Sequence, residues 1–205
     1  MAGKVFFSVS MSLDGFIAPR TSDELMGKQW MALQQWVFPQ RFFRGNVGLG
    51  DGGEEGRDND ILRETFERTG ASVMGKRMFD AGESAWPEDA PFHTPVYVVT
   101  HERRDPWERL GGTTFHFVNS GIESALEQAR DAAGDRDVRI AGGGEIILQY
   151  LNAGSVDEFS IALSPVLFGA GVRLFDGIDV ERVGLEMVST EASERVTHLE
   201  YRVRR

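Results

Sequence analysis

Short apolar runs rich in Val and Phe alternate with amphipathic stretches along most of the chain. Apolar runs of this length predict buried strands, and apolar residues at helical spacing predict helices. We therefore expect strands in residues 4–12, at the start of 71–82, at the start of 94–105 and in 113–119, and helices over 60–70 and 120–134. Residues 137–154 predict a strand, three glycines and a helix. Strands that alternate with helices favour an α/β fold with a mostly parallel sheet covered on both faces.

Two other stretches have different patterns. Residues 183–205 predict two strands joined by a short connection, with Thr197, Leu199, Tyr201 and Val203 on one face. We expect them to form an antiparallel hairpin at the edge of the sheet. Residues 21–43 predict a helix from the apolar side chains at 30, 33 and 37. The Gly-rich, acidic residues 45–60 predict a mobile loop.

Composition narrows the class of protein. The 205 residues carry a formal net charge of -10 and no cysteine, and 41% of them are hydrophobic. This predicts one domain with a sizeable core, excludes disulfides and Cys-ligated metals, and argues against a nucleic-acid binder. No metal site is expected, because residues 45–60 fit neither a phosphate-binding loop nor a calcium loop. The first residues do not resemble a signal peptide and no apolar run could span a membrane, so we expect a cytoplasmic protein.

Three consecutive glycines, Gly142, Gly143 and Gly144, follow a predicted strand and open a predicted helix. The unpaired amides and the dipole of a helix N-terminus favour an anion, and the lack of side chains lets a phosphate approach the backbone. A tight turn would need a single glycine, so the run favours a phosphate site. The spacing differs from the G-x-G-x-x-G pattern of common dinucleotide-binding folds.

Two more strand ends carry groups that suit an anion. Gly75 ends one strand and is followed by Lys76 and Arg77; Thr100 and His101 end another and are followed by two more arginines. Each group alone is also compatible with solvated basic residues. The carboxyl ends of parallel strands share one edge of a sheet, so all three groups can reach one extended ligand. A dinucleotide with a pyrophosphate and an additional phosphate fits this pattern.

The motifs SMSLDGFIA, VMGKRMF, VVTHERR and RIAGGGEI resemble the dihydrofolate reductase fold. The sequence is more similar to a bacterial branch that includes the reductase domain of bifunctional riboflavin-biosynthesis deaminase-reductases, as SPVLFGAGVRLFDG also indicates. The resemblance covers nearly the whole chain except residues 21–59. It implies a three-layer α/β domain over residues 1–205, with a mixed, mostly parallel sheet, helices on both faces, and an inserted helix and acidic loop at about 21–59.

The resemblance also implies NADPH as the cofactor and hydride donor. It implies that Ala18 lies near the nicotinamide, that Gly75, Lys76 and Arg77 lie near the pyrophosphate and 2′-phosphate, that Thr100 and His101 lie on the adenosine side, and that Gly142, Gly143, Gly144, Glu145 and Ile146 lie under the pyrophosphate and nicotinamide.

Two aspartates are candidates for the catalytic carboxylate. Members of the resembled family carry a carboxylate early in the helix before the MGR-type strand, and Asp60 is the best match by position; as an alternative it is a helix N-cap. Asp14 lies in the loop expected to face the substrate, and its alternative is an ordinary Asp-Gly turn. The Pro-Trp of true dihydrofolate reductases is missing, since Arg20 follows Pro19. His198 is expected to be a structural or surface residue.

We therefore expect an NADPH-dependent reductase that transfers a hydride to a pterin or a ribosylated aminopyrimidine. One alternative is a catalytically weak nucleotide-binding protein that keeps the fold as a sensor or assembly partner. A second alternative is an enzyme that uses NADH. We expect a homodimer, as in the riboflavin-pathway relatives, with contact through the C-terminal edge strands, and neither a nucleic acid nor a membrane as partner.

Overall fold

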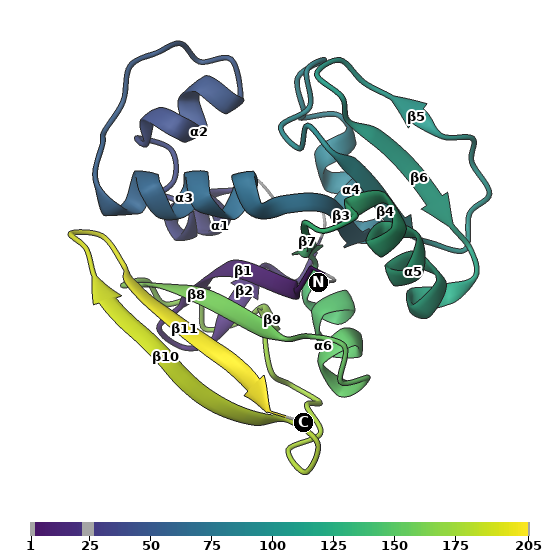
Figure 1. Cartoon of the computed structure of the whole chain (residues 1–205). Coiled ribbons are helices and arrows are strands. Elements are labelled where there is room, and N and C mark those ends of the chain that lie inside the picture. Colours follow the sequence, from purple (N-terminus) through teal and green to yellow (C-terminus); the bar gives the residue numbers. More distant parts are fainter. Residues whose placement is uncertain (1–2, 22–26, 205) are drawn as a thin grey trace.

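The computed structural model describes residues 3–21 and 27–204 (Figure 1). Its strands are β1 (Val5–Ser12), β2 (Phe16–Ala18), β3 (Thr69–Gly75), β4 (Pro95–Val99), β5 (Trp107–Glu108), β6 (Thr114–Val118), β7 (Asp137–Gly142), β8 (Glu158–Ser164), β9 (Val172–Arg173), β10 (Gly184–Ala192) and β11 (Thr197–Arg204). Its helices are α1 (Lys28–Leu33), α2 (Arg41–Asn46), α3 (Arg57–Arg68), α4 (Lys76–Glu83), α5 (Gly121–Ala133) and α6 (Gly144–Asn152).

One large sheet organises the molecule. Its strand order is β10-β11-β8-β1-β7-β3-β4-β6-β5, and β2 and β9 form a separate antiparallel pair. The six central strands, from β8 to β6, are parallel. The hairpin β10–β11 extends one edge antiparallel to β8, and the short β5 extends the other edge antiparallel to β6. This confirms the predicted mixed, mostly parallel sheet and the edge hairpin, which is yellow in Figure 1.

Helices cover both faces of the sheet. On one face α5 contacts β3 and β4, and α6 contacts β7, around a core that includes Phe7, Ile140 and Tyr150. On the other face Phe79 of α4 is fully buried over β4 and β6, and Leu62 of α3 packs near Ala162 of β8. Strand β1 contributes side chains to both faces, because successive residues of a strand point to opposite sides of the sheet. The predicted three-layer α/β architecture is thereby confirmed.

The insertion differs from its prediction. Residues 21–43 were expected to form one helix, but α1 ends at Leu33 and α2 begins at Arg41 (the expected residues 22–26 lie outside those described). Pro39 lies between the two helices, and a proline has no amide hydrogen and disfavours helical backbone in the residue before it. Helix α3 begins at Arg57 and not at Asp60, because Gly56 precedes it as N-cap with a φ of 126°. Asp60 therefore lies inside the first turn and is not the cap.

The fully buried strand β3 ends at the carboxyl edge of the sheet, beside the ends of β7 and β4. This edge is where α4 and α6 begin. None of the helices in the described ranges is both long and apolar enough to cross a membrane.

Candidate cofactor and substrate site

The three groups that the sequence predicts to bind an anion lie at one edge of the sheet. Met74, the residue before Gly75 in β3, pairs with Gly142 of β7, and Gly75 itself pairs with Val99 of β4. The α4 N-terminus, the α6 N-terminus and the turn that begins at Thr100 are therefore neighbours. The prediction that these strand ends share one edge is confirmed.

Two of the three glycines in the run have a reason within the fold. Gly142 has a φ of 127°, which side-chain-bearing residues rarely adopt, and a Cβ there would lie 2.8 Å from the Met78 sulfur. A Cβ on Gly144 would lie 2.9 Å from Val172 of β9 and 3.0 Å from Ile17 of β2. The bare backbone at these positions lets β7 turn and lets the β2–β9 pair cover the start of α6. The peptide bond between Gly142 and Gly143 is cis.

The fold does not require a glycine at position 143. Its backbone is extended, with φ -79° and ψ -169°, and a Cβ built on it would meet no atom within 4 Å. It is the N-cap of α6, so the amides of the first helical turn open beside it. The fold leaves open space at the place where a phosphate could approach those amides.

Ala18, Glu145 and Ile146 surround this helix start. Ala18 ends β2 and pairs with Val172, whose side chain reaches Gly144. Ile146 is buried, and its Cγ1 would lie 2.8 Å from a Cβ on Gly75, so α6 and the end of β3 are in close contact. Glu145 is exposed on the first turn of α6. The structure thus brings the predicted cofactor-binding glycines together with Ala18; their roles stay predictions.

The two predicted cations at α4 have partners within the chain. The ammonium of Lys76 lies 2.5 Å from Asp80 and 3.2 Å from Glu102, and the hydrogen bond to Asp80 raises the pKa of Lys76. The Arg77 guanidinium donates hydrogen bonds to the backbone carbonyls of Pro19 and Arg20, at 2.7 and 2.8 Å. Arg77 therefore holds the segment after β2 against α4, a contact that sequence reasoning did not predict.

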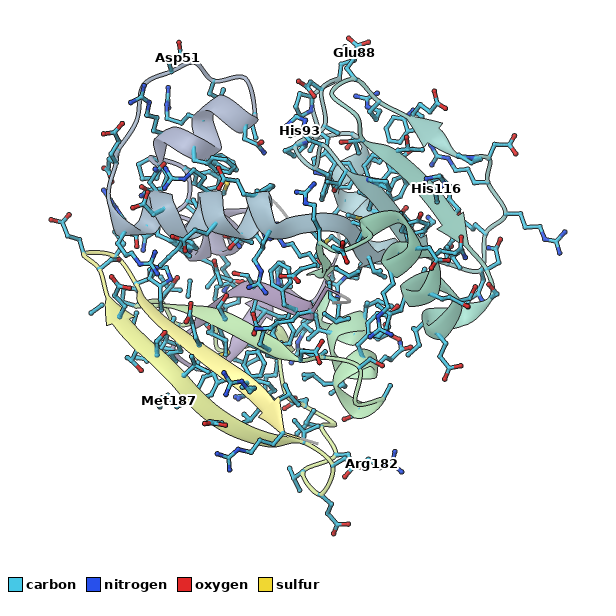
Figure 2. All side chains as sticks on the ribbon, in the orientation of Figure 1. Asp51, Glu88, His93, His116, Arg182 and Met187 are labelled. Atoms are coloured by element: carbon cyan, nitrogen blue, oxygen red, sulfur yellow. The ribbon has the colours of Figure 1, made fainter. Side chains whose placement is uncertain are left out.

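Thr100 and His101, the residues predicted to lie on the adenosine side, are next to a cavity. Thr100 is buried and its hydroxyl accepts the Glu102 amide at 3.0 Å, whereas His101 is exposed. A cavity of about 460 Å³ adjoins this turn, and Asn119 connects the two by donating to the Thr100 carbonyl at 3.1 Å. The cavity is lined by Arg104, Pro106, His116, Phe117, Val118, Asn119, Ser120 and Gln128. Burial lowers the pKa of His116, which Figure 2 labels on β6.

Asp14 is fastened within its own loop. The Ser12 hydroxyl donates to its carboxylate at 2.7 Å, and the amides of Phe168 and Gly169 donate at 3.0 and 2.7 Å. The hydrogen bond from Ser12, with those from the two amides, lowers the pKa of Asp14 to about 2. A carboxyl that stays ionised is a poor proton donor near neutral pH, so this geometry favours a structural role. The catalytic role of Asp14 stays a prediction.

Asp60 faces outward on α3. Its carboxylate accepts a hydrogen bond from Arg63 at 2.8 Å, and its side chain is 40% exposed. Two residues earlier, Asp58 is buried and its Oδ1 lies 2.7 Å from Nε2 of His198, which is also buried. The sequence did not single out Asp58, and it predicted His198 only as a structural or surface residue, without a partner. The available signal was the alternation in β11, which places His198 opposite to the apolar Leu199 face.

The Asp58–His198 pair belongs to a polar network at the carboxyl edge of the sheet. The Trp36 ring contacts His198 edge-on, and its indole nitrogen donates to the Ser10 hydroxyl at 2.9 Å. Ser10 in turn donates to Gln34 at 2.9 Å. His198 and Ser10 both pair with Ala162 of β8, in the carboxyl-terminal halves of β1 and β8. The network therefore lies toward the same edge as the glycines. No cluster of three or more potential metal ligands occurs in residues 3–21 and 27–204.

The hydrogen bonds of Asp14 to Ser12, Phe168 and Gly169 predict that the stability of the fold depends on pH. The pKa of Asp14 is lower in the folded chain than its ordinary value of 3.8, so its stabilising contribution is present above about pH 4 and is lost as the pH falls toward 2. We expect Asp14→Asn to lower the urea midpoint at pH 7, and the gap from the wild type to narrow between about pH 4 and pH 2. Tryptophan fluorescence during urea unfolding measures both midpoints.

Asp51, at the exposed tip of the insertion in Figure 2, provides the control. Asp51→Asn removes the same charge and should leave the midpoint close to that of the wild type at each pH. A gap for Asp14→Asn that stays constant over the whole pH range would contradict the assignment.

Comparison with curated proteins finds two relatives from Bacillus subtilis (strain 168). The chain is 37% identical to the uncharacterized protein YyaP over 75 residues, which is 36% of this chain and 38% of YyaP. It is 28% identical to the uncharacterized protein YwjB over 147 residues, or 72% of this chain and 81% of YwjB. The aligned part thus spans well under half of YyaP but most of YwjB.

Solved structures share the fold. A putative riboflavin biosynthesis protein from Shewanella sp. PV-4 aligns over 100% of both chains, with a TM-score of 0.66 and 23% identity. Dihydrofolate reductase from Enterococcus faecalis, complexed with NADP(H), aligns over 99% of this chain and 98% of its own, with a TM-score of 0.57 and 13% identity. A Thermotoga maritima deaminase and 5-amino-6-(5-phosphoribosylamino)uracil reductase aligns over 98% of this chain and 57% of its own, with a TM-score of 0.57 and 16% identity.

A family model covers almost the whole chain. It matches residues 3–199 and is described as the RibD C-terminal domain. The match includes all the strand ends that form the candidate site, and it includes the Asp58–His198 pair. On this evidence the chain belongs to the RibD C-terminal domain family.

Proposed function

We propose that this protein is a reductase that binds NADPH across the carboxyl edge of its sheet and transfers a hydride to a small heterocyclic acceptor. The observation that carries the proposal is the open space in front of Gly143, at a helix N-terminus, in a run where the other two glycines are explained by the fold. Family membership supports it, as does the shared fold with a dihydrofolate reductase complexed with NADP(H).

The residues present fit an extended nucleotide. The first amides of α6 would hold the pyrophosphate, and the β2–β9 pair with Ala18 would cover the nicotinamide end. The cavity beside Thr100 would take the adenine end, where Asn119, Ser120 and Arg104 supply polar groups beside the Phe117 side chain. When bound, NADPH supplies the hydride; the protein positions it and excludes water.

The polar network marks the acceptor side. The Asp58–His198 pair, Ser10 and Gln34 lie on the α3 face of β1, β8 and β11. A heterocycle with several donors and acceptors, such as a pterin or a ribosylated aminopyrimidine, suits such a surface. We assign proton donation to Asp58 with His198 in preference to Asp60, because Asp60 points outward to Arg63. Asp58, Trp36 and His198 would have to shift for an acceptor to reach the pair, since all three are buried.

The glycine argument predicts a selective defect in Gly143→Ala. The added methyl group meets no protein atom and the backbone is extended, so the melting temperature should change little. The methyl group would occupy the space proposed for the pyrophosphate, so NADPH should bind about tenfold more weakly. Calorimetric titration with NADPH measures the affinity.

Gly45→Ala is the matched control, since a Cβ there also meets nothing within 4 Å. It should leave NADPH binding unchanged. Equal NADPH affinity in the wild type and Gly143→Ala would remove the main support for the site. Tight NADPH binding by the wild type without turnover of any pterin or aminopyrimidine would favour the alternative, a nucleotide-binding protein that keeps the fold as a sensor.

The proton-donor assignment predicts different effects for two aspartates on α3. We expect Asp58→Asn to lower kcat by about 100-fold, in the range of general acid catalysis, with little change in NADPH affinity. Asp60→Asn should keep kcat within about twofold of the wild type. Steady-state loss of reduced-nicotinamide absorbance measures kcat, and thermal unfolding checks that each variant is folded at the assay temperature. A larger loss in Asp60→Asn than in Asp58→Asn would return the role to Asp60.

We also propose a homodimer through β10. This outer strand pairs with β11 on one side, and it exposes Leu185, Met187 and Val188. Figure 2 labels Met187 on this strand at the outer edge of the molecule. A long edge strand with exposed apolar side chains is a common contact between chains.

Met187→Lys should shift the protein from dimer to monomer in light scattering after size-exclusion chromatography. Val180→Lys is the control, because Val180 is 77% exposed but lies outside the strand. A monomeric wild type, or a dimer unaffected by Met187→Lys, would refute contact through β10.

A further inference from the structure

Lys76 is shared between two carboxylates at the edge proposed for the cofactor. It is the first residue of α4, directly after Gly75. Its ammonium lies 2.5 Å from Asp80, one turn further along the helix, and 3.2 Å from Glu102, in the turn after β4. The three side chains together carry a net charge of about -1 at neutral pH. An arriving phosphate would therefore meet a cation that is already neutralised.

Two neighbouring cations, Arg77 and Arg104, are also engaged. Arg77 donates both of its short hydrogen bonds to the carbonyls of Pro19 and Arg20. Arg104 is paired with Glu83 at 2.6 Å and lies over three aromatic rings. Among Lys76, Arg77 and Arg104, Lys76 is the one with an ion-pair partner, Glu102, that is exposed and lies in the turn after β4.

The two contacts of Lys76 differ in kind. Asp80 is on the same helix and holds the ammonium in place. Glu102 reaches Lys76 from the turn after β4, its contact is longer, and its side chain is 65% exposed. Glu102 can therefore leave Lys76 without disturbing α4, and it is the partner that a ligand would replace.

We propose that Glu102 sets how strongly this site prefers NADPH over NADH, and that it weakens this preference. The inference rests on the proposed function, since it requires a dinucleotide with its adenosine end beside Thr100. The 2′-phosphate of NADPH must compete with Glu102 for Lys76, and the Glu102 carboxylate repels it. The ribose 2′-hydroxyl of NADH, in contrast, can donate a hydrogen bond to the Glu102 carboxylate. Glu102 thereby narrows the difference in affinity between NADPH and NADH.

The test compares dissociation constants for NADPH and NADH, measured by calorimetric titration at low ionic strength, in three proteins. Glu102→Gln should bind NADPH about three- to fivefold more tightly than the wild type, the range of one exposed ion pair, and should bind NADH no more tightly. Glu186→Gln is the matched control. It removes the same charge from β10, at the opposite edge of the sheet, and should change neither affinity.

The outcomes separate the two proposals. If the wild type binds neither nucleotide, the proposed function fails and this inference fails with it. If both nucleotides bind but Glu102→Gln changes their affinities equally, or changes neither, Glu102 does not set the preference and the proposed function stands. An equal gain in Glu186→Gln would assign the effect to the net charge of the molecule and would also overturn the inference.

Discussion

Two parallel strands, β3 and β7, end side by side on glycines that leave room for side chains of the helices that follow, and the candidate site depends on this close approach. Gly75 leaves room for Ile146, and Gly142 leaves room for Met78, in each case where a Cβ would come within 2.8 Å. Because of these contacts the N-termini of α4 and α6 open at the same edge of the sheet. Gly75 and Gly142 are thus required for packing, whereas Gly143 is the glycine that we propose leaves the helix amides accessible.

The arrangement of strand ends could be predicted because it follows from local patterns. A buried strand, a glycine and a helix start are each visible in a short stretch, and parallel strands end at one edge by geometry. The roles of individual side chains could not be predicted in the same way. Nothing near Lys76 in the sequence indicates that Glu102 is its partner, and Arg77 bonds to backbone carbonyls, which carry no sequence signal.

The aspartates of α3 show how a small boundary error changes a site. Asp60 was expected to begin the helix, whereas the helix begins at Arg57 because Gly56 supplies the turn. Each helical residue turns by about 100°, so Asp58 and Asp60 point in nearly opposite directions. One carboxylate therefore meets His198 in the interior and the other meets Arg63 near the surface. The partner of Asp58 lies 140 residues away, and a contact of that separation leaves no periodic trace.

The charge of the molecule limits how it can attract an anionic cofactor. The chain has a formal net charge of -10, and Lys76, Arg77 and Arg104 are each engaged with partners inside the chain. Long-range attraction is accordingly weak, and at physiological ionic strength charges are screened beyond about 8 Å. In the proposed site, the helix amides and dipoles would add a short-range attraction, and they are neutral overall and do not repel one another. A site of this kind selects by shape and hydrogen bonding at close contact, which is why the space in front of Gly143 matters more than the number of cations around it.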